Sequence, residues 1–500
     1  MRLTPSIGEM TPEQIMRKKP FSVPIPPDEI KFNAIKPGQV VTLPTDVIKY
    51  EARSQADFIM EYYPTSHKIN TIKYYPNTMY VNKDTGAYTA KVRSRISIGY
   101  QNRILVKRKE SLLGNNVGMK LISDATKQKN IDLLARFREG WEERDMEVII
   151  DKAIESDFMT GDTAVYVFMD DKKVNCRVFS YKDGDILYPH YDSLTNELML
   201  LGRAYKQTDW NGNETLYLDV VDKTHFVTYK QNENASWEME GEPQPHGFPF
   251  CPVAYHRSDG PVWSGSQSLI DGYEMAISQF SENNAAYALR ILYTLGGEME
   301  IMTNTDGTPS RIDSVDPNAK VGFLEPAQGA EGAFATQLGI MEKNIMRCSF
   351  AVETPEIKSG ADMSSRTVKM LFADSYVKAL ADSLEYQPFL NRVAYLFKFG
   401  YFMENTKVNV SDSFKVKCYL DPFIFLSEND VIAAIQQLVA TGAMSRKTAT
   451  EIAYNIGYSS PDEMARIAQE AHDELVAESQ AQAQAQKTNN NPVAASRNNA

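Results

Sequence analysis

Apolar residues recur at alternating steps of three and four in two stretches of the second half of the chain. The first stretch covers residues 266–297, and its stripe consists of Ile270, Tyr273, Ile277, Phe280, Tyr287 and Ile291, with the polar Asn284 in the same register. The second covers residues 333–352, and its stripe consists of Phe334, Leu338, Met341, Ile345, Cys348 and Val352. This spacing puts apolar side chains on one face of a helix. We therefore predict two amphipathic helices that pack antiparallel and need further helices as partners.

The segment between these helices, residues 298–332, is acidic and contains turn signals. It holds seven acidic and two basic residues, and its turns are expected at Asp306-Gly307, Thr308-Pro309 and Asp316-Pro317. Glu298 to Met302 and Lys320 to Leu324 read as short strands. Because a two-stranded hairpin alone is marginally stable in water, we expect these strands to pair between adjacent copies of the chain.

A third and longer helix is expected after a polar loop. Ser364 or Ser365 provides an N-cap, and the helix should run to about Met403 with a bend at Pro388, which lacks a backbone donor. Three smaller helices are predicted over residues 428–441, 446–456 and 461–478. The Ala-Gln repeats and the Asn-rich end after them predict a disordered tail over residues 479–500.

The first half of the chain mixes helix and strand signals. Thr11-Pro12-Glu13-Gln14 predicts a short capped helix, and residues 128–158 read as one helix with Ile131, Leu134, Phe137, Trp141, Met146 and Ile149 buried. Residues 74–110 show strand-like alternation. Residues 163–255 are rich in strand signals, with hairpin turns expected at Asp183-Gly184 and Asn211-Gly212. The predicted fold class is therefore α+β.

Composition limits the possible functions. The 500 residues are 43% apolar, which is ample for buried cores, and carry a formal charge of −12. A negative chain lacks the Lys and Arg excess that gives non-specific affinity for nucleic acid, although it would suit a conduit that DNA must traverse without sticking. No apolar run reaches about 18 residues and no signal-peptide core is present, so we expect no membrane span. Cys176, Cys251, Cys348 and Cys418 form no CxxC pair and are expected to be reduced core thiols.

Motifs for catalysis are weak. Residues 114–120 are the nearest match to a phosphate-binding loop, but their spacing is wrong and Leu121 stands where a hydroxyl is needed. The six histidines show no close ligand pairing. Asp170-Asp171 and Asp183-Gly184-Asp185 fall at expected turns, where acids are common. We therefore predict no catalytic residues, no metal site and no cofactor.

Four segments, taken in order, resemble the portal proteins of tailed phages. Residues 156–167 resemble the passage from a helix to the strands of the family's wing. Residues 245–255 and 265–271, read PHGFPFCPVAY and GSQSLID, resemble its wing-to-stem passage. Residues 341–345 and 359–371 resemble the second stem helix, the tunnel loop and the start of the long kinked helix. Residues 426–448 resemble the crown. Each motif is short, but the order of the four across residues 90–475 identifies the chain as a member of this family.

The resemblance implies a division of the chain into the parts of a portal subunit. These are an N-terminal arm and the start of the wing (1–90), an α+β wing (91–265), a first stem helix (266–297), a clip (298–332), a second stem helix (333–352), a tunnel loop (353–363), a long kinked helix that returns to the wing (364–424), a crown (425–478) and the tail (479–500).

The same resemblance implies a function without chemistry. The chain would form a ring, by analogy a dodecamer, through which double-stranded DNA is packaged and ejected without sequence specificity. Its partners would be the terminase large subunit, the major capsid protein and a head-completion or tail protein, at the portal vertex of the virion after assembly in the host cytoplasm. The channel rim would be formed by Glu353, Glu356, Lys358, Gly360 and Asp362. Partner contacts of the clip would be made by Asp306, Asp313 and Asp316.

Three questions stay open at the level of the sequence. The basic patch formed by Lys91, Arg93, Arg95, Arg103, Lys107, Arg108 and Lys109 is either a solvated strand face or a contact with capsid, scaffold or DNA. A metal-dependent nucleic-acid enzyme, such as a nuclease or nucleotidyl transferase, is one alternative function. A monomeric capsid-associated adaptor is the other.

Overall fold

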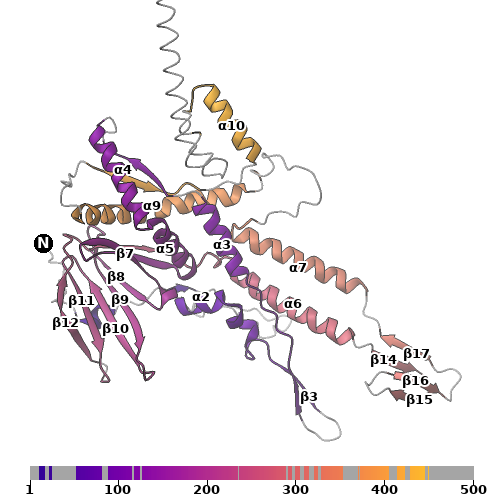
Figure 1. The fold of residues 1–500 in the computed structure, drawn as a ribbon. Helices are drawn as coiled ribbons and strands as arrows, with labels where there is room; N and C mark the ends of the chain where they lie inside the picture. Colours follow the sequence, from indigo (N-terminus) through magenta and orange to yellow (C-terminus); the bar gives the residue numbers. More distant parts are fainter. Residues whose placement is uncertain are drawn as a thin grey trace, which may run out of the picture. The chain divides into compact units, whose positions relative to one another are not determined.

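The computed structural model describes most of the chain. It describes residues 11–16, 22–24, 52–81, 88–114, 117–123, 127–234, 236–288, 291–295, 299–303, 309–314, 320–324, 328–352, 370, 372–404, 414–422, 428–444 and 449. The chain divides into two compact units: residues 1–355 with 373–423, and residues 356–372 with 424–500. Mixed helices and strands make up the first unit, which confirms the α+β class (Figure 1).

The described helices are α1 (Pro12–Met16), α2 (Gln55–Tyr62), α3 (Tyr100–Leu113), α4 (Gln128–Glu143), α5 (Met146–Thr160), α6 (Gln267–Ala288), α7 (Gln328–Cys348), α9 (Ala373–Glu404) and α10 (Glu428–Ala440). The described strands are β1 (Ser22–Pro24), β2 (Ala52–Ser54), β3 (Thr78–Val81), β4 (Tyr88–Lys91), β5 (Gly118–Leu121), β6 (Asp162–Asp170), β7 (Lys173–Phe179), β8 (Ile186–Tyr191), β9 (Leu198–Thr208), β10 (Glu214–Val221), β11 (His225–Gln231), β12 (Trp237–Pro245), β13 (Val253–Arg257), β14 (Ile291–Leu295), β15 (Met299–Thr303), β16 (Pro309–Ser314), β17 (Lys320–Leu324) and β18 (Val416–Tyr419).

The main core lies where α5 leads into the three-stranded sheet β13-β6-β7 and packs with α9. Gly161 ends α5 in the left-handed region, at φ 83°, where glycine carries no steric cost, and β6 begins at the next residue. The rings of Phe137, Trp141 and Phe397 meet edge-on or tilted at centroid distances of 5.5–5.8 Å and join α4 to α9. Burial of these aromatic side chains is a main source of the unit's stability.

A second sheet is an antiparallel meander in the order β12-β11-β10-β9-β8. The predicted turn at Asn211-Gly212 joins β9 to β10, with Gly212 at φ 84°, which confirms that hairpin. Helix α1 forms as predicted: Thr11 and Gln14 exchange the two bonds of a capping box. It buries Ile15 on the meander, where Gly202 leaves the space that the Ile15 side chain fills.

Several sequence predictions for the first half were wrong. Residues 100–113 form helix α3, because Tyr100, Ile104, Leu105, Arg108 and Leu112 are buried at a period near 3.6 and not 2. Asp183-Gly184 is no hairpin turn: it links β7 and β8, which lie in different sheets.

The single helix predicted over residues 128–158 is two helices, α4 and α5. The break lies at Arg144 and Asp145, with Asp145 at φ 48°, because the step of five from Trp141 to Met146 interrupts the 3.6-residue period. Phe137, Trp141 and Met146 are buried as predicted, but Ile131 is exposed.

The long helix near the C-terminus is confirmed as α9, which runs through Pro388 to Glu404. It begins at Ala373, and the predicted N-cap serines lie outside the described residues. The bend expected at Pro388 stays a prediction. In the second unit, α10 matches the first small helix, and Gly442 follows it at φ 71°. Of the predicted helix over residues 446–456 the structure describes residue 449 alone, and the predicted helix over 461–478 and the tail lie outside the described residues.

Candidate functional site

Helices α6 and α7 pack against each other as the two stripes predicted. The rings of Phe280 and Phe334 stack with their centroids 5.4 Å apart, and a Cβ atom on Gly272 would lie 3.3 Å from the end of the Met341 side chain. Ile270, Tyr273 and Ile345 are buried in the main core, and Ile277, Leu338 and Met341 pack against it. Figure 1 shows the two helices side by side, leading to β14–β17. We call this element the α6–α7 hairpin.

The first helix of the hairpin is shorter than predicted. It ends at Ala288, with Tyr287 in its last turn, and Ile291 lies in strand β14. The sequence Ile-Leu-Tyr-Thr-Leu favours a strand, since β-branched and aromatic residues suit a pleated surface, and a partner strand is available in β17. The assignment of Ile291 to the helix stripe was therefore wrong.

Helix α3 of the same chain covers part of the predicted stripe. Tyr100 of α3 meets the Tyr273 ring edge-on at 5.5 Å, and its hydroxyl group donates a hydrogen bond to Oε1 of Glu342 in α7, at 3.1 Å. Cys348, predicted to lie in the second stripe, is exposed instead. The base of the hairpin is therefore fixed on α3.

An extended segment, residues 94–98, runs along α6 and is held by helix side chains. The backbone N–H of Ser94 donates to Glu282, that of Ile96 to Ser278 and that of Ile98 to Glu274, at 2.8–3.2 Å. Four helical residues rise about 6 Å and two extended residues span about 6.6 Å, so the two spacings match closely. Sequence reasoning missed this ladder; Glu274, Ser278 and Glu282, polar at i, i+4 and i+8 beside an apolar stripe, were the available signal.

A buried side-chain hydrogen bond secures the same helix. Nδ1 of His67 lies 2.6 Å from Oε1 of Glu274, and both side chains are almost fully buried. Next to it, Nζ of Lys68 lies 2.9 Å from Oδ2 of Asp271. The chain before α3 is therefore anchored on α6 by both backbone and side-chain bonds.

Most of the predicted basic patch is neither a solvated strand face nor a free cationic surface. Arg93 donates to Thr78 and lies over the Tyr75 ring, and Arg95 donates to the Tyr75 carbonyl and to Asn77. Lys109 of α3 pairs with Asp151 and Glu155 of α5. These cations lie in helix α3 or beside α6, where acids and carbonyl groups of the same chain bind them.

Arg108, the most buried member of that patch, joins three helices. Its guanidinium group donates to the Ser349 carbonyl, just past α7, at 3.2 Å, and forms an ion pair with Asp382 of α9. Lys378 also pairs with Asp382, at 2.8 Å. Because a buried guanidinium without acceptors is costly, this contact fixes the end of α7 relative to α9.

Helix α7 ends in a strained residue. Phe350 has φ 56°, and the bonds Phe350 N–H to Arg347 O and Ala351 N–H to Met346 O form a Schellman motif, in which the left-handed position is usually glycine. A left-handed non-glycine residue costs on the order of 1 kcal/mol. The strain lies at the point where the chain leaves the hairpin.

Replacing Phe350 with glycine is expected to raise the free energy of unfolding by about 0.5–1 kcal/mol, because the left-handed backbone then carries no side-chain clash. Phe350→Ala is the matched control. It also removes the ring, which is partly exposed, but it keeps the Cβ atom and therefore the cost of the left-handed backbone. Thermal unfolding of the two variants measures the difference. Equal stability of Gly and Ala variants would show that Phe350 is unstrained.

The acidic segment, together with strand β14 just before it, forms two antiparallel ribbons in place of the two strands predicted. β14 pairs with β17, from Ile291–Leu324 to Leu295–Lys320, and β15 pairs with β16, with Glu300 opposite Asp313. Each predicted strand therefore pairs with another strand of its own chain, whereas we had expected the two strands to pair between adjacent copies. In the part of the chain that the structure describes, each ribbon has two strands, and pairing between copies stays a prediction. Asp306 and Asp316 lie outside the described residues, as do Glu353, Glu356, Lys358, Gly360 and Asp362.

Two fully buried carboxyl groups lie where α5, β6, β13 and α9 meet. The Tyr386 hydroxyl group donates to Asp157, and Nε2 of His256 lies 3.8 Å from the same carboxyl group. Asp162 accepts from Nε2 of Gln55 at 2.6 Å. Burial raises the pKa of Asp157 and of Asp162 to about 7 and lowers the pKa of His256. These two carboxyl groups lie among buried core residues, and neither belongs to the α6–α7 hairpin.

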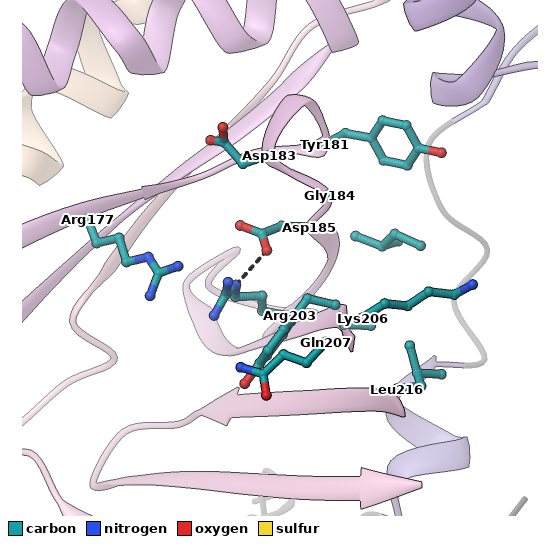
Figure 2. A pocket seen from close by; sticks show the side chains of 12 residues that line it. Arg177, Tyr181, Asp183, Gly184, Asp185, Arg203, Lys206, Gln207 and Leu216 are labelled. Atoms are coloured by element: carbon teal, nitrogen blue, oxygen red, sulfur yellow. Dashed lines mark hydrogen bonds and ion pairs between the residues drawn. The ribbon is translucent and has the colours of Figure 1, made fainter. Parts of the chain in front are cut away.

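A pocket lies beside the meander, and Figure 2 shows its polar centre. Arg203 donates to Asp185 at 2.8 Å and to Asp219 at 3.0 Å, and its guanidinium group lies over the rings of Phe179 and Tyr205. Burial raises the pKa of Asp185 and of Asp219 despite the arginine. The charged groups of Arg203, Asp185 and Asp219 thus bind each other, which suits a structural role in which they hold neighbouring strands together.

Other candidate chemistry is sparse in the described residues. They contain no group of three or more His, Cys, Asp or Glu residues arranged to hold a metal ion. Asp171, one of the acids weighed as a catalytic carboxylate, lies in the tight β6–β7 turn at φ 45°. Of the described helices, none combines the length and the apolar character needed to cross a bilayer. Cys251 and Cys418 are buried and Cys176 is half-buried.

Comparison with known proteins gives one family match. The sequence profile of the family described as "Phage portal protein, SPP1 Gp6-like" matches residues 48–476. A chain of the "Virion of native gene transfer agent (GTA) particle" is 12% identical with a TM-score of 0.36, covering 72% of this chain and 89% of that chain. A chain of the "Neck of empty GTA particle computed with C6 symmetry" is 12% identical with a TM-score of 0.38, covering 72% and 90%. No curated protein matches. The family match spans the whole α6–α7 hairpin and all of α9.

Proposed function

Because this chain belongs to the SPP1 Gp6-like family of phage portal proteins, we propose that it forms the ring at one capsid vertex through which genomic DNA is packaged and later ejected. The family is one of structural proteins, so the chain supplies a channel wall and not a reaction. In the proposed ring, a dodecamer, the terminase large subunit docks during packaging, and a head-completion or tail protein replaces it. The ring assembles in the host cytoplasm, meets the major capsid protein and ends in the virion.

The observation that carries this proposal is the family match over residues 48–476. The α6–α7 hairpin supports it, because two packed helices that lead to β ribbons are suited to the stem and clip of a portal subunit. The α3 contacts through Tyr100 and Arg108 hold that hairpin firmly on the α+β core, which would act as the wing. Residues 353–363 would be the tunnel loop, and residues 425–478 the crown.

The test of the proposal is the mass and shape of the purified chain. We expect a ring with a central hole in negative-stain images and a light-scattering mass many times the 56.4 kDa of one chain. A monomer at every concentration would support the capsid-associated adaptor. Metal-dependent cleavage or joining of nucleic acid, lost on substitution of a carboxylate, would support the enzyme.

The proposed clip is expected to attract a basic terminase surface through its acidic residues. Replacing Asp306, Asp313 and Asp316 with Asn should leave the ring intact and slow terminase association, chiefly at low ionic strength, because charge complementarity acts mainly on the association rate. Binding kinetics on assembled rings at low and moderate salt measure this effect. An association rate unchanged at both salt concentrations would remove these carboxylates from the docking surface.

The proposed tunnel loop is expected to let DNA slide because its rim is acidic. The double substitution Glu353→Lys and Glu356→Lys should slow or stall packaging without preventing ring assembly, since the added cations would bind phosphates. Packaging assays with rings of each type measure the rate. The double substitution to Gln is the matched control, and normal packaging by the lysine variant would place these side chains away from DNA.

A further inference from the structure

Helix α9 carries an exposed apolar seam on its N-terminal half. Val377, Leu380 and Leu384 have exposed fractions of 64%, 39% and 74%, and Ala373, Ala381 and Pro388 are exposed beside them. Residues 373, 377, 380 and 384 follow the alternating steps of four, three and four that make a helix–helix seam. The opposite face of the same helix, with Ala379, Asp382 and Tyr386, is buried in the main core. The opposite face thus holds the helix firmly, and no segment that the structure describes covers the seam.

Helix α7 offers a face of complementary shape. Ile340 is 55% exposed, and Ala335 and Thr336 are exposed one turn before it. A Cβ atom on Gly332 or Gly339 would meet nothing within 4 Å, so the helix backbone is open to close approach on this face. Bulky residues on α9 and small residues on α7 can interdigitate as ridges into grooves.

The charges beside the two faces are also complementary. Asp374 and Glu385 are exposed beside the α9 seam, and Lys343 and Arg347 are exposed beside Ile340 on α7. Among the described residues, none of these four side chains makes an ion pair or a hydrogen bond. Opposite charges beside matching apolar faces favour a defined partner and disfavour contact of either face with itself.

We propose that the α9 seam of one subunit docks on the exposed α7 face of the next copy of this chain. The two faces lie on different helices of the same subunit, so each subunit can use both at once, one toward each neighbour. Such a head-to-tail contact repeats around a ring, whereas a contact of a face with itself stops at a dimer. The inference rests on the proposed ring and names the surfaces that close it.

Two single substitutions separate the two faces. Leu384→Asp places a charge in the α9 seam, and Ile340→Asp places one on the α7 face; both positions are exposed in the subunit, so its fold should tolerate them. Each should weaken association at least roughly a hundredfold and abolish the ring, because a desolvated, unpaired charge would lie in every contact. Leu194→Asp, at a side chain that is 91% exposed in the β8–β9 turn, is the matched control and should leave the ring intact.

Mixing the two variants gives the decisive result. The Leu384→Asp chain keeps a good α7 face and the Ile340→Asp chain keeps a good α9 seam, so the mixture should form a dimer with one chain of each kind and no ring. A seam that contacts its own copy would instead let the Ile340→Asp chain dimerise alone. Light scattering with one chain fused to a mass tag distinguishes these outcomes, and dimers of a single kind would overturn the head-to-tail contact.

Charge exchange tests the same contact without touching its apolar residues. Asp374→Lys with Glu385→Lys should weaken ring assembly at low salt, and adding Lys343→Glu with Arg347→Glu to the same chain should restore it.

The outcomes for the interface and for the proposed function can be told apart. If the wild-type chain and the Leu384→Asp variant both form rings, this interface is wrong and the proposed function still stands. If that variant keeps its ring but loses thermal stability within the subunit, another segment of the same chain covers the seam. A wild-type chain that is always monomeric would overturn both proposals.

Discussion

Replacing Arg108 with methionine is expected to lower the free energy of unfolding by about 3 kcal/mol. Methionine keeps most of the length of the side chain but leaves the Asp382 carboxyl group and the Ser349 carbonyl without the guanidinium group. Removing one partner of a buried ion pair typically costs about 3–5 kcal/mol. The lower end applies here because Lys378 still pairs with Asp382. Urea unfolding, followed by the fluorescence of the buried Trp141 and Trp263, measures the change at one fixed protein concentration.

Two controls show whether the buried charge is the cause. The double variant Arg108→Met with Asp382→Leu should recover much of the stability, because no buried carboxyl group then lacks its partner and the partly exposed Lys378 can turn to water. Lys107→Met, on the same helix, removes only an ion pair with the exposed Glu110 and should change stability by less than about 0.5 kcal/mol. Equal losses for Arg108→Met and the double variant would mean that side-chain packing, not charge, explains the effect.

Replacing Asp157 with asparagine is expected to raise stability at pH 8 by on the order of 2–4 kcal/mol. The wild-type carboxyl group is buried and its pKa is raised to about 7, above its ordinary value near 3.8. Its favourable contribution is therefore complete below pH 3.8, declines by about 1.4 kcal/mol per pH unit as the pH rises to about 7, and is constant above that. Asparagine does not ionise and still offers an oxygen atom to the Tyr386 hydroxyl group.

The pH dependence separates this effect from a change in packing. Urea unfolding at pH 4, 6 and 8 should show the Asp157→Asn variant gaining on the wild type as pH rises, with little or no gain at pH 4. The favourable contribution of Asp162 to stability declines over the same pH range, so the stability of the variant still falls somewhat as the pH rises. His256, whose pKa burial lowers, acts in the opposite direction below about pH 6.5. Asp171→Asn, at an exposed turn, is the control, and a difference independent of pH would contradict the buried ionisation.

The local elements that the sequence predicted well are those with a long period or a defined cap. The helices of the α6–α7 hairpin, the helix through Pro388 and the capped helix at Pro12 could be predicted because periodicity and capping signals lie in neighbouring residues. The predictions that failed depended on distant residues. Tyr287 and Ile291 continue one apolar stripe, yet Ile291 pairs with Leu324, which is 33 positions away.

The sequence by itself determined the family, the α+β class and the order of the main helices, because these depend on periodicity, capping and motif order along the chain. Only the tertiary structure decided what the charges do. Arg93, Arg95, Arg108 and Lys109 read as one basic patch, but folding brings each to an acid or carbonyl group that lies elsewhere in the chain. Likewise, the α9 seam became visible only once the core had buried the other face of that helix. An ion pair or a free surface is a relation between residues in space, and spacing along one segment cannot specify it.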